Sequence, residues 1–301
     1  MVSSGKKLIV ITGPTAVGKT RLCLDIAKHF DIPIINADSR QIYKDLNIGT
    51  ARPTTEEMQE VKHYFVGMLG LEDYYSASLF EQQVLELLEK LFRNSNYALM
   101  TGGSMMYIDA VCNGIADIPT IDDETRKTMK RRLQEEGLES LCKELRQLDP
   151  EYYEIVDRQN PKRVVHALEI CTMTGKTYTS FRKREKKVRP FQIIKIGLNR
   201  DRAELYDRIN ARVDEMMEKG FLKEAEGLFP LRKLNALNTV GYKELFEYFE
   251  GRWTLEEAIE RMKGNTRRYA RKQLTWYKKD DQIKWFHPNQ KEDIINYISS
   301  I

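Results

Sequence analysis

The sequence predicts an α/β protein in which helices flank a mostly parallel sheet and an all-helical lobe interrupts the chain. Short apolar runs typical of buried strands alternate with helical patterns. The alternation stops between about 122 and 183, where only charged helical stretches occur, and it resumes at 193–196. We therefore expect a sheet-containing core made of residues 1–118 and 190–301, and a helical insertion made of residues 119–189.

The individual elements follow from the spacing of the apolar residues. Strands are predicted at 8–11, 33–35, 97–100 and 193–196, with an edge strand at 283–286. Helices are predicted at 21–30 in the core, at 124–136, 138–148 and 161–173 in the insertion, and at 203–229, 241–249 and 255–278 in a helical C-terminal region. Asp122–Asp123 and Asn160–Pro161 are typical helix starts, through side-chain capping and proline in the first turn.

The composition is that of an ordinary soluble globular protein of 301 residues, with 41% hydrophobic and 31% charged residues. The apolar stretch that follows the N-terminal residues is only four residues long, too short for a signal peptide or a membrane span. We expect a cytoplasmic, monomeric protein without membrane association. The four cysteines contain no C-x-x-C pair, so the spacing indicates neither a zinc site nor a disulfide framework.

Positive charge is concentrated in two stretches, although the net charge is only +4. Residues 182–189 and 261–279 are strongly basic, and the second stretch carries Tyr269, Trp276 and Tyr277 among its cations. Such stretches suit a polyanionic partner, and a solvated helix face explains them equally well.

A phosphate-binding loop is the most specific motif. Two glycines enclose four residues and are followed by a lysine and a hydroxyl, in Gly13, Pro14, Thr15, Ala16, Val17, Gly18, Lys19 and Thr20. In such a loop the backbone amides approach phosphate oxygens, the lysine charge reaches the outer phosphates and the threonine hydroxyl holds Mg²⁺. The flanking strand and helix supply the required context, so we expect a P-loop NTPase-like core that binds a phosphorylated ligand.

Two further features are predicted at the carboxyl ends of strands, where open α/β sheets bind ligands. Asp38 follows the strand at 33–35, and its carboxylate suits a base, a water-mediated Mg²⁺ contact or a helix cap. The turn at 101–104 places Ser104 and two glycines after another strand, and turn geometry alone also explains that pair. No other strand ends in a metal-binding aspartate, which argues against a motor ATPase and favours the nucleotide-kinase type.

Several motifs together resemble the bacterial tRNA dimethylallyltransferase family, also called tRNA isopentenyltransferases. They are GPTAVGKT at 13–20, DSRQIY at 38–43, NIGTARP at 47–53, GGSMMY at 102–107, NPKRVVHALE at 160–169, VGYKE at 240–244 and TRRYARKQLTW at 266–276. The resemblance covers nearly the whole chain. It implies transfer of a dimethylallyl group from dimethylallyl diphosphate to N6 of the adenosine 3′-adjacent to the anticodon of tRNA, with Mg²⁺ as cofactor.

The resemblance also implies roles for individual residues. Asp38 is the expected base, Ser104 lies near the reacting centre, and Arg212 is a further cation for the diphosphate or the transition state. The tRNA anticodon stem-loop is expected to meet Asp38, Ser39, Arg40, Gln41, Ser104, Arg126, Lys162, Arg163 and His166. An exposed helix surface is the alternative for Lys162 and Arg163, and packing is the alternative for His166.

The chain departs from the family pattern at several positions within these motifs. Arg40 stands where methionine is usual, Asn47 where aspartate is usual, Ser104 where threonine is usual, and Met105 where glycine is often found. Val165 and His166 stand where a polar residue and arginine are common. Arg40 adds a charge beside the expected nucleotide contact, which predicts an altered acceptor preference.

Three other functions are compatible with a phosphate loop. A relative could prenylate free adenine nucleotides, but a mononucleotide needs neither the inserted lobe nor the basic C-terminal helix. A small-molecule kinase would transfer the γ-phosphate of ATP. A non-catalytic RNA-binding ATPase would keep its RNA affinity without Asp38 and would turn over no diphosphate.

Overall fold

The computed structural model describes residues 5–116, 118–119, 121–182 and 187–301. The chain forms two compact units, a core made of Met1–Asn113 and Val188–Ile301 and a helical unit made of Gly114–Lys187. The edges of the helical unit lie a few residues from the expected limits of 119 and 189. Four members of the basic stretch 182–189, residues 183–186, lie outside the described residues.

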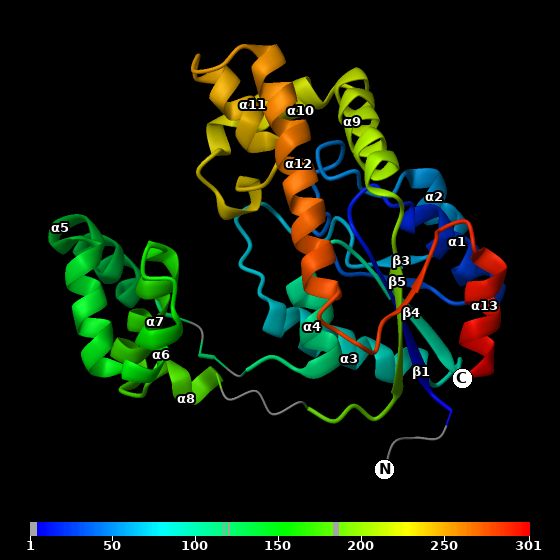
Figure 1. The fold of residues 1–301 in the computed structure, drawn as a ribbon, viewed down its shortest axis with the longest axis horizontal. Coiled ribbons are helices and arrows are strands. Elements are labelled where there is room, and N and C mark those ends of the chain that lie inside the picture. Colours follow the sequence, from blue (N-terminus) through cyan, green and yellow to red (C-terminus); the bar gives the residue numbers. More distant parts are fainter. Residues whose placement is uncertain (1–4, 117, 120, 183–186) are drawn as a thin grey trace. The chain divides into compact units, whose positions relative to one another are not determined.

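A six-stranded parallel sheet organises the core (Figure 1). Its order is β3-β2-β4-β1-β5-β6, and every neighbouring pair is parallel. The strands are β1 (Lys7–Thr12), β2 (Ile34–Asn36), β3 (His63–Tyr64), β4 (Tyr97–Thr101), β5 (Gln192–Leu198) and β6 (Lys284–Phe286). The predicted fold class and all five predicted strands are confirmed. Only β3 was not predicted, because two residues are too short to show a period.

Helices cover both faces of this sheet, and the side chains of β1 alternate between the two faces. Ile9 and Ile11 pack with α1 (Lys19–Phe30), α9 (Arg202–Glu218) and α13 (Lys291–Ser300). Leu8 and Val10 pack with α3 (Ala77–Leu91) and α4 (Met105–Asn113) on the opposite face. The β1 strand is buried over most of its length, so the loop that follows it starts from a rigid position.

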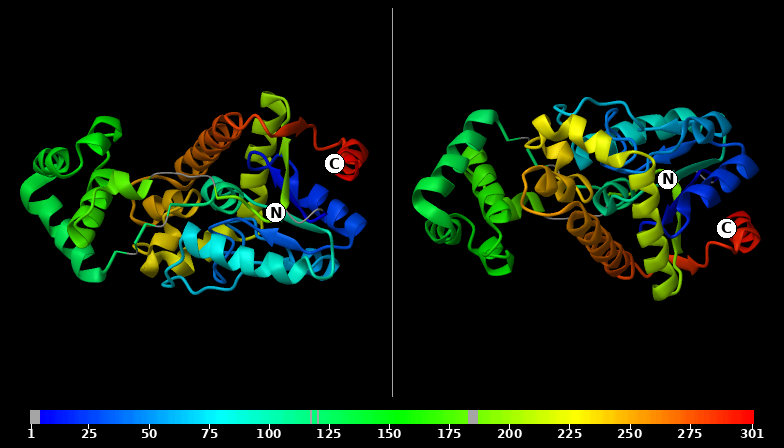
Figure 2. Two further views of the ribbon diagram at one scale, coloured as in Figure 1. Left: turned by 90° about the horizontal axis from the view of Figure 1, so that it is seen from below. Right: turned by 90° about the horizontal axis from the view of Figure 1, so that it is seen from above.

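A third hydrophobic cluster joins the C-terminal helices above the sheet. It brings together α10 (Phe221–Leu228), α11 (Tyr242–Phe249) and α12 (Leu255–Tyr277), with α12 lying beside α9 (Figures 1 and 2). The predicted helix at 203–229 is wrong in its length, because Gly220 adopts a left-handed conformation with φ 96° and separates α9 from α10. The remaining short helices are α2 (Thr55–Glu60), η1 (Phe229–Leu231) and η2 (Asn235–Leu237).

The helical unit packs four helices around its own small core (Figure 2). They are α5 (Asp123–Leu148), α6 (Pro150–Ile155), α7 (Pro161–Thr174) and α8 (Tyr178–Arg182). Gly137, with φ 80°, kinks α5 at the point between its two predicted halves. Side chains of Asp122, Asp149 and Asn160 cap α5, α6 and α7, which confirms the two predicted helix starts.

No helix within the described ranges is long and apolar enough to cross a membrane. All four cysteines carry free thiols, and Cys23, Cys112 and Cys171 are buried.

Candidate active site

The phosphate loop leaves β1 and enters α1 through backbone conformations that favour glycine. Gly13 has φ 144°, and a Cβ there would lie 2.7 Å from the carbonyl oxygen of Leu198. Gly18 is the N-cap of α1 with φ 106°, and it has no side chain to cap the first N–H groups. The first turn of α1 therefore keeps its amides for a ligand anion.

The Lys19 side chain turns back onto the phosphate loop and binds its backbone. Its Nζ donates to the carbonyl oxygens of Gly13 (2.9 Å) and Pro14 (2.8 Å). Burial and, to a smaller extent, the nearby Arg212 lower the pKa of Lys19 to about 8, while Asp38 opposes the shift. A cation whose charge is held at a buried position gains strongly from a ligand anion.

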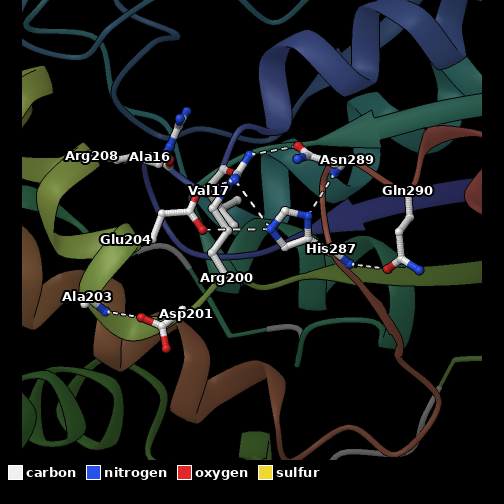
Figure 3. Close-up of polar contacts among 10 residues, drawn as sticks. All are labelled: Ala16, Val17, Arg200, Asp201, Ala203, Glu204, Arg208, His287, Asn289 and Gln290. Atoms are coloured by element: carbon white, nitrogen blue, oxygen red, sulfur yellow. Dashed lines mark hydrogen bonds and ion pairs between the residues drawn. The ribbon is translucent and has the colours of Figure 1, made fainter.

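Two arginines hold the carbonyl oxygens of the loop from outside (Figure 3). Arg208 of α9 donates from Nε to Ala16 at 2.9 Å, and Arg200 donates from Nε to Val17 at 2.8 Å. Ala16 has φ 63°, an uncommon conformation for a residue with a side chain. Because its carbonyl is held, this conformation is maintained by its surroundings.

Arg200 is itself held by Glu204 of α9 and by His287 and Asn289, which follow β6 (Figure 3). Its Nη1 donates to Glu204 at 2.5 Å and lies 3.5 Å from Nε2 of His287, and its Nη2 lies 3.4 Å from the side-chain oxygen of Asn289. The guanidinium is thereby oriented on several sides, and the outer wall of the phosphate loop with it.

Asp38 lies just beyond β2, in a tight turn that fixes one of its oxygens. Its Oδ1 accepts from the backbone N–H groups of Arg40 (2.9 Å) and Gln41 (3.3 Å), so the capping-type interaction is real. Its Oδ2 occupies different space, 2.7 Å from where a Cβ on Gly103 would stand. Glycine at 103 therefore keeps the space beside Oδ2 open, while Oδ1 anchors the turn.

The second glycine turn brings Ser104 beside Asp38. A Cβ on Gly102 would lie 2.2 Å from the carbonyl of Ala37, which requires glycine there. The Ser104 hydroxyl accepts from the backbone N–H of Ser39 (2.8 Å) and donates to its hydroxyl (3.0 Å). Gly102 is thus required by the geometry of the turn, and Ser104 lies beside the Asp38 turn.

Two cavities meet at this point. The first, of about 610 Å³, is lined by the phosphate loop and Lys19, and the second, of about 580 Å³, by Ser39, Ser104 and α12. Residues common to both linings are Thr15, Asp38, Thr50, Arg212 and Tyr269. Two ligands, one in each cavity, would therefore meet beside the Asp38 carboxylate and the Arg212 guanidinium.

Arg212 projects from α9 to this junction. Its Nη1 lies 3.3 Å from the Thr15 hydroxyl, and burial lowers its pKa while Asp38 opposes the shift. Arginine stays charged even so. The junction thus combines a fixed cation with a carboxylate.

A half-buried carboxylate holds the loop that borders both cavities. Glu224 of α10 accepts from the backbone N–H groups of Ile48 (2.8 Å) and Gly49 (2.9 Å) and from the Tyr242 hydroxyl (2.6 Å). The Asn47 N–H is 3.3 Å from the same carboxylate. The side chain at position 47 is therefore not what fixes this loop.

The predicted diphosphate residues divide into two sets. Thr15, Ala16, Gly18, Lys19 and Thr20 line the first cavity. Gly13, Pro14 and Val17 are buried and shape the loop from beneath. Over the described part of the chain no group of three His, Cys, Asp or Glu side chains is placed to hold a metal ion, so a Mg²⁺ at Thr20 would take most of its ligands from phosphate oxygens and water.

The residues expected to contact the nucleotide are partly bound by the protein itself. Arg40 lines the second cavity, but its Nη1 donates to the carbonyls of Asn235 (2.8 Å) and Ala236 (3.1 Å). Gln41 donates from Nε2 to Thr50 and Ala51, both at 3.0 Å. Both side chains therefore shape the cavity walls, which sequence patterns alone did not indicate.

The other predicted RNA contacts lie in the helical unit. Arg126 of α5 and Lys162 and Arg163 of α7 are exposed, and none of them forms an ion pair with any residue that the structure describes. His166 lies 3.6 Å from a Glu169 carboxylate oxygen and packs edge-on against Tyr178, so packing is observed for this side chain.

Several site residues were missed by the sequence reasoning. Gln273 and Tyr269 of α12 contact the glycine turn, and Arg200 and Arg208 contact the phosphate loop. Residues 269 and 273 fall within one of the quoted motifs, which was the only available signal. The two arginines gave none, because Arg200 lies in the connection between β5 and α9 and Arg208 lies on a charged helix face, where arginine usually indicates surface.

The parallel sheet, the phosphate loop and the adjoining acceptor cavity define a P-loop α/β protein of the group-transfer type. A family model described as IPP transferase matches residues 41–280. A tRNA dimethylallyltransferase from Phocaeicola vulgatus is 63% identical over 98% of both chains, and one from Bacteroides fragilis is 59% identical over 99% of both. The chain belongs to this IPP transferase family.

Solved structures show the same relationship. The tRNA isopentenylpyrophosphate transferase from Bacillus halodurans matches with a TM-score of 0.73 at 33% identity, over 98% of this chain and 96% of that one. A eukaryotic dimethylallyltransferase acting on tRNA matches with a TM-score of 0.84 at 25% identity, over 98% and 80%.

Proposed function

We propose that this protein transfers the dimethylallyl group of dimethylallyl diphosphate to N6 of the adenosine 3′-adjacent to the anticodon in tRNA. The observation that carries the proposal is the junction of the two cavities at Asp38 and Arg212. One cavity offers a phosphate-binding loop and the other offers room for a base, and the groups suited to transfer lie between them. The similarity to tRNA dimethylallyltransferases supports both substrates.

In the first half of the reaction, the bond between the allylic carbon and the diphosphate oxygen breaks. Lys19, the first amides of α1 and Arg212 bind the diphosphate and stabilise the negative charge that it gains as a leaving group. Thr20 and the diphosphate would hold Mg²⁺, which would supply Lewis-acid charge neutralisation. Arg200 and Arg208 fix the phosphate loop before the ligand binds, which reduces the reorganisation needed when this charge develops.

In the second half, the adenine N6 forms a bond to the allylic carbon and loses a proton. The N6 lone pair is delocalised into the ring, so removal of the proton during attack helps the reaction. Oδ2 of Asp38 accepts this proton, because Oδ1 is occupied by two backbone N–H groups. Ser104 holds the backbone of Ser39 and thus the turn that carries Asp38.

The tRNA substrate requires more surface than the cavities provide. The target base is stacked in the anticodon loop and must turn out to enter the second cavity. We assign the exposed cations Arg126, Lys162 and Arg163 to the phosphates of the anticodon stem-loop. A tRNA substrate places the reaction in the cytoplasm, and one chain holds all the residues assigned here, so a monomer suffices.

The test is direct incubation of the protein with Mg²⁺, dimethylallyl diphosphate and unmodified tRNA carrying adenosine 3′ of the anticodon. Nucleoside mass spectrometry is expected to find isopentenyladenosine at that position in the wild type and not in Asp38→Asn. Modification of AMP, ADP or ATP instead of tRNA would favour the free-nucleotide branch. Transfer of label from γ-labelled ATP to a small acceptor, without prenylation, would favour a kinase.

A further inference from the structure

A fully buried glutamine on α12 lies between the two halves of the active site. Gln273 has no exposed surface. Its Oε1 accepts from the backbone N–H of Thr15 in the phosphate loop at 2.8 Å, and its Nε2 donates to the carbonyl oxygen of Gly103 at 2.8 Å. One side chain therefore joins the diphosphate loop to the turn beside Asp38, although the three segments lie far apart in the sequence.

The chemistry of the site requires a carboxamide at this position. A carboxamide supplies an acceptor and a donor at the same end of one side chain. Glutamate would keep the bond from Thr15 but would place a second negative charge against the Gly103 carbonyl, near Asp38. Leucine would leave the N–H of Thr15 without its hydrogen-bond partner, which destabilises the loop.

Both attachment points lie next to reacting groups. Thr15 lines both cavities, and its hydroxyl meets Arg212. Gly103 lies against Oδ2 of Asp38, the oxygen assigned to the proton. If a change at Gln273 moves Thr15 or Gly103, the separation between the diphosphate and the Asp38 carboxylate therefore changes.

The N–H of Thr15 is also removed from the set of phosphate ligands by this bond. The Thr15 hydroxyl meets Arg212, while the Thr15 backbone anchors the loop to α12. Loss of Gln273 should for this reason change the geometry of transfer more than the affinity for the diphosphate.

Tyr269, one turn earlier on α12, makes a second bond to the same carbonyl. Its hydroxyl donates to the Gly103 oxygen at 2.9 Å. The glycine turn is thus held twice from α12, whereas the link to the phosphate loop passes through Gln273.

We propose that Gln273 is a positioning residue that sets the distance between the diphosphate loop and the Asp38 carboxylate. The inference rests on the proposed prenyl transfer. Positional errors of about 1 Å reduce transfer rates by about 100-fold, so Gln273 has a large effect on turnover through the two segments it joins.

The experiment measures steady-state kinetics of Gln273→Glu and Gln273→Leu with dimethylallyl diphosphate and tRNA. Gln282→Leu, an exposed glutamine at the sheet edge, is the matched control. We expect kcat to fall about 10- to 100-fold in both Gln273 variants, with each KM changed less than about threefold. Tyr269→Phe, which keeps the Thr15 link, should lose less turnover than either.

Thermal melts show whether each variant is folded, and Gln273→Glu is the milder change if Gln273→Leu does not fold. The inference is overturned if folded Gln273→Glu turns over within about threefold of the wild type, or if KM rises in place of the fall in kcat. A wild type that turns over no tRNA would overturn the proposed function itself, and the inference with it. Wild-type turnover with unchanged Gln273 variants would overturn the inference alone.

Discussion

The phosphate loop and the exposed cations of the helical unit both suit anions, but they are built in opposite ways. In the loop, Lys19, Arg200 and Arg208 bind backbone carbonyl oxygens, and Arg200 is itself held by Glu204 and Asn289. In the helical unit, Lys162 and Arg163 are exposed at the start of α7. The difference indicates that the first region is organised for a fixed ligand geometry and the second for long-range attraction of a polyanion.

The largest effect is expected at the carboxylate between the cavities. Asp38→Asn removes the proton acceptor while keeping an oxygen for the turn, so kcat should fall about 10²- to 10⁴-fold. Binding of tRNA, measured by filter retention, should change less than about threefold. The exposed Asp281→Asn is the control, and a fully active Asp38→Asn would show that this carboxylate is only a turn anchor.

The next effect concerns the charge inside the phosphate loop. Lys19 has a pKa of about 8, so its charge in the free protein is present below that pH and is lost above it. We expect kcat/KM for dimethylallyl diphosphate to fall about tenfold per pH unit above 8, while kcat stays level, since the bound diphosphate stabilises the ammonium.

Lys19→Met should remove this alkaline decline and lower kcat/KM at pH 7 about 100-fold. Pre-steady-state and steady-state rates across pH 6.5 to 9.5 provide the measurement, at pH values chosen to bracket a pKa of about 8. A decline of the same size and position in Lys19→Met would assign the titration to another group.

The helical unit should respond to salt and not to pH. Charge reversal in Lys162→Glu with Arg163→Glu is expected to weaken tRNA binding about tenfold at low salt and to reduce the slope of log affinity against log salt by about one to two. Lys90→Glu on the exposed face of α3 is the control. An unchanged slope would show that Lys162 and Arg163 belong to an ordinary solvated helix surface.

The smallest effect is expected at Arg40, which lines the second cavity and, like the cations of the phosphate loop, binds backbone carbonyl oxygens. Arg40→Met removes hydrogen bonds to the carbonyls of Asn235 and Ala236, and should lower the free energy of unfolding by about 1 kcal/mol. Turnover should stay within about threefold, with Arg40→Lys intermediate in a thermal melt. A large loss of tRNA turnover without loss of stability would show that Arg40 contacts the nucleotide directly.

Much of this organisation was predictable because it depends on local patterns. The apolar runs identified five of six strands, since buried parallel strands are continuously apolar. Gly13, Gly18 and Lys19 identified the phosphate loop because its chemistry lies in consecutive residues. The helix predicted at 203–229 failed at Gly220 because a single glycine often remains within a helix, and only packing decides whether it breaks.

By itself the sequence determined the fold class, the phosphate loop, the place of Asp38 after a strand and, through several ordered motifs, the family. Tertiary structure alone decided which distant side chains hold those motifs. Gln273 meets Thr15, Glu224 holds the loop at 48–49, and Arg40 binds the turn at 235–236. The reason is physical: a local motif follows from bonds between near neighbours, whereas a hydrogen bond between distant segments exists only after packing has brought the two partners together.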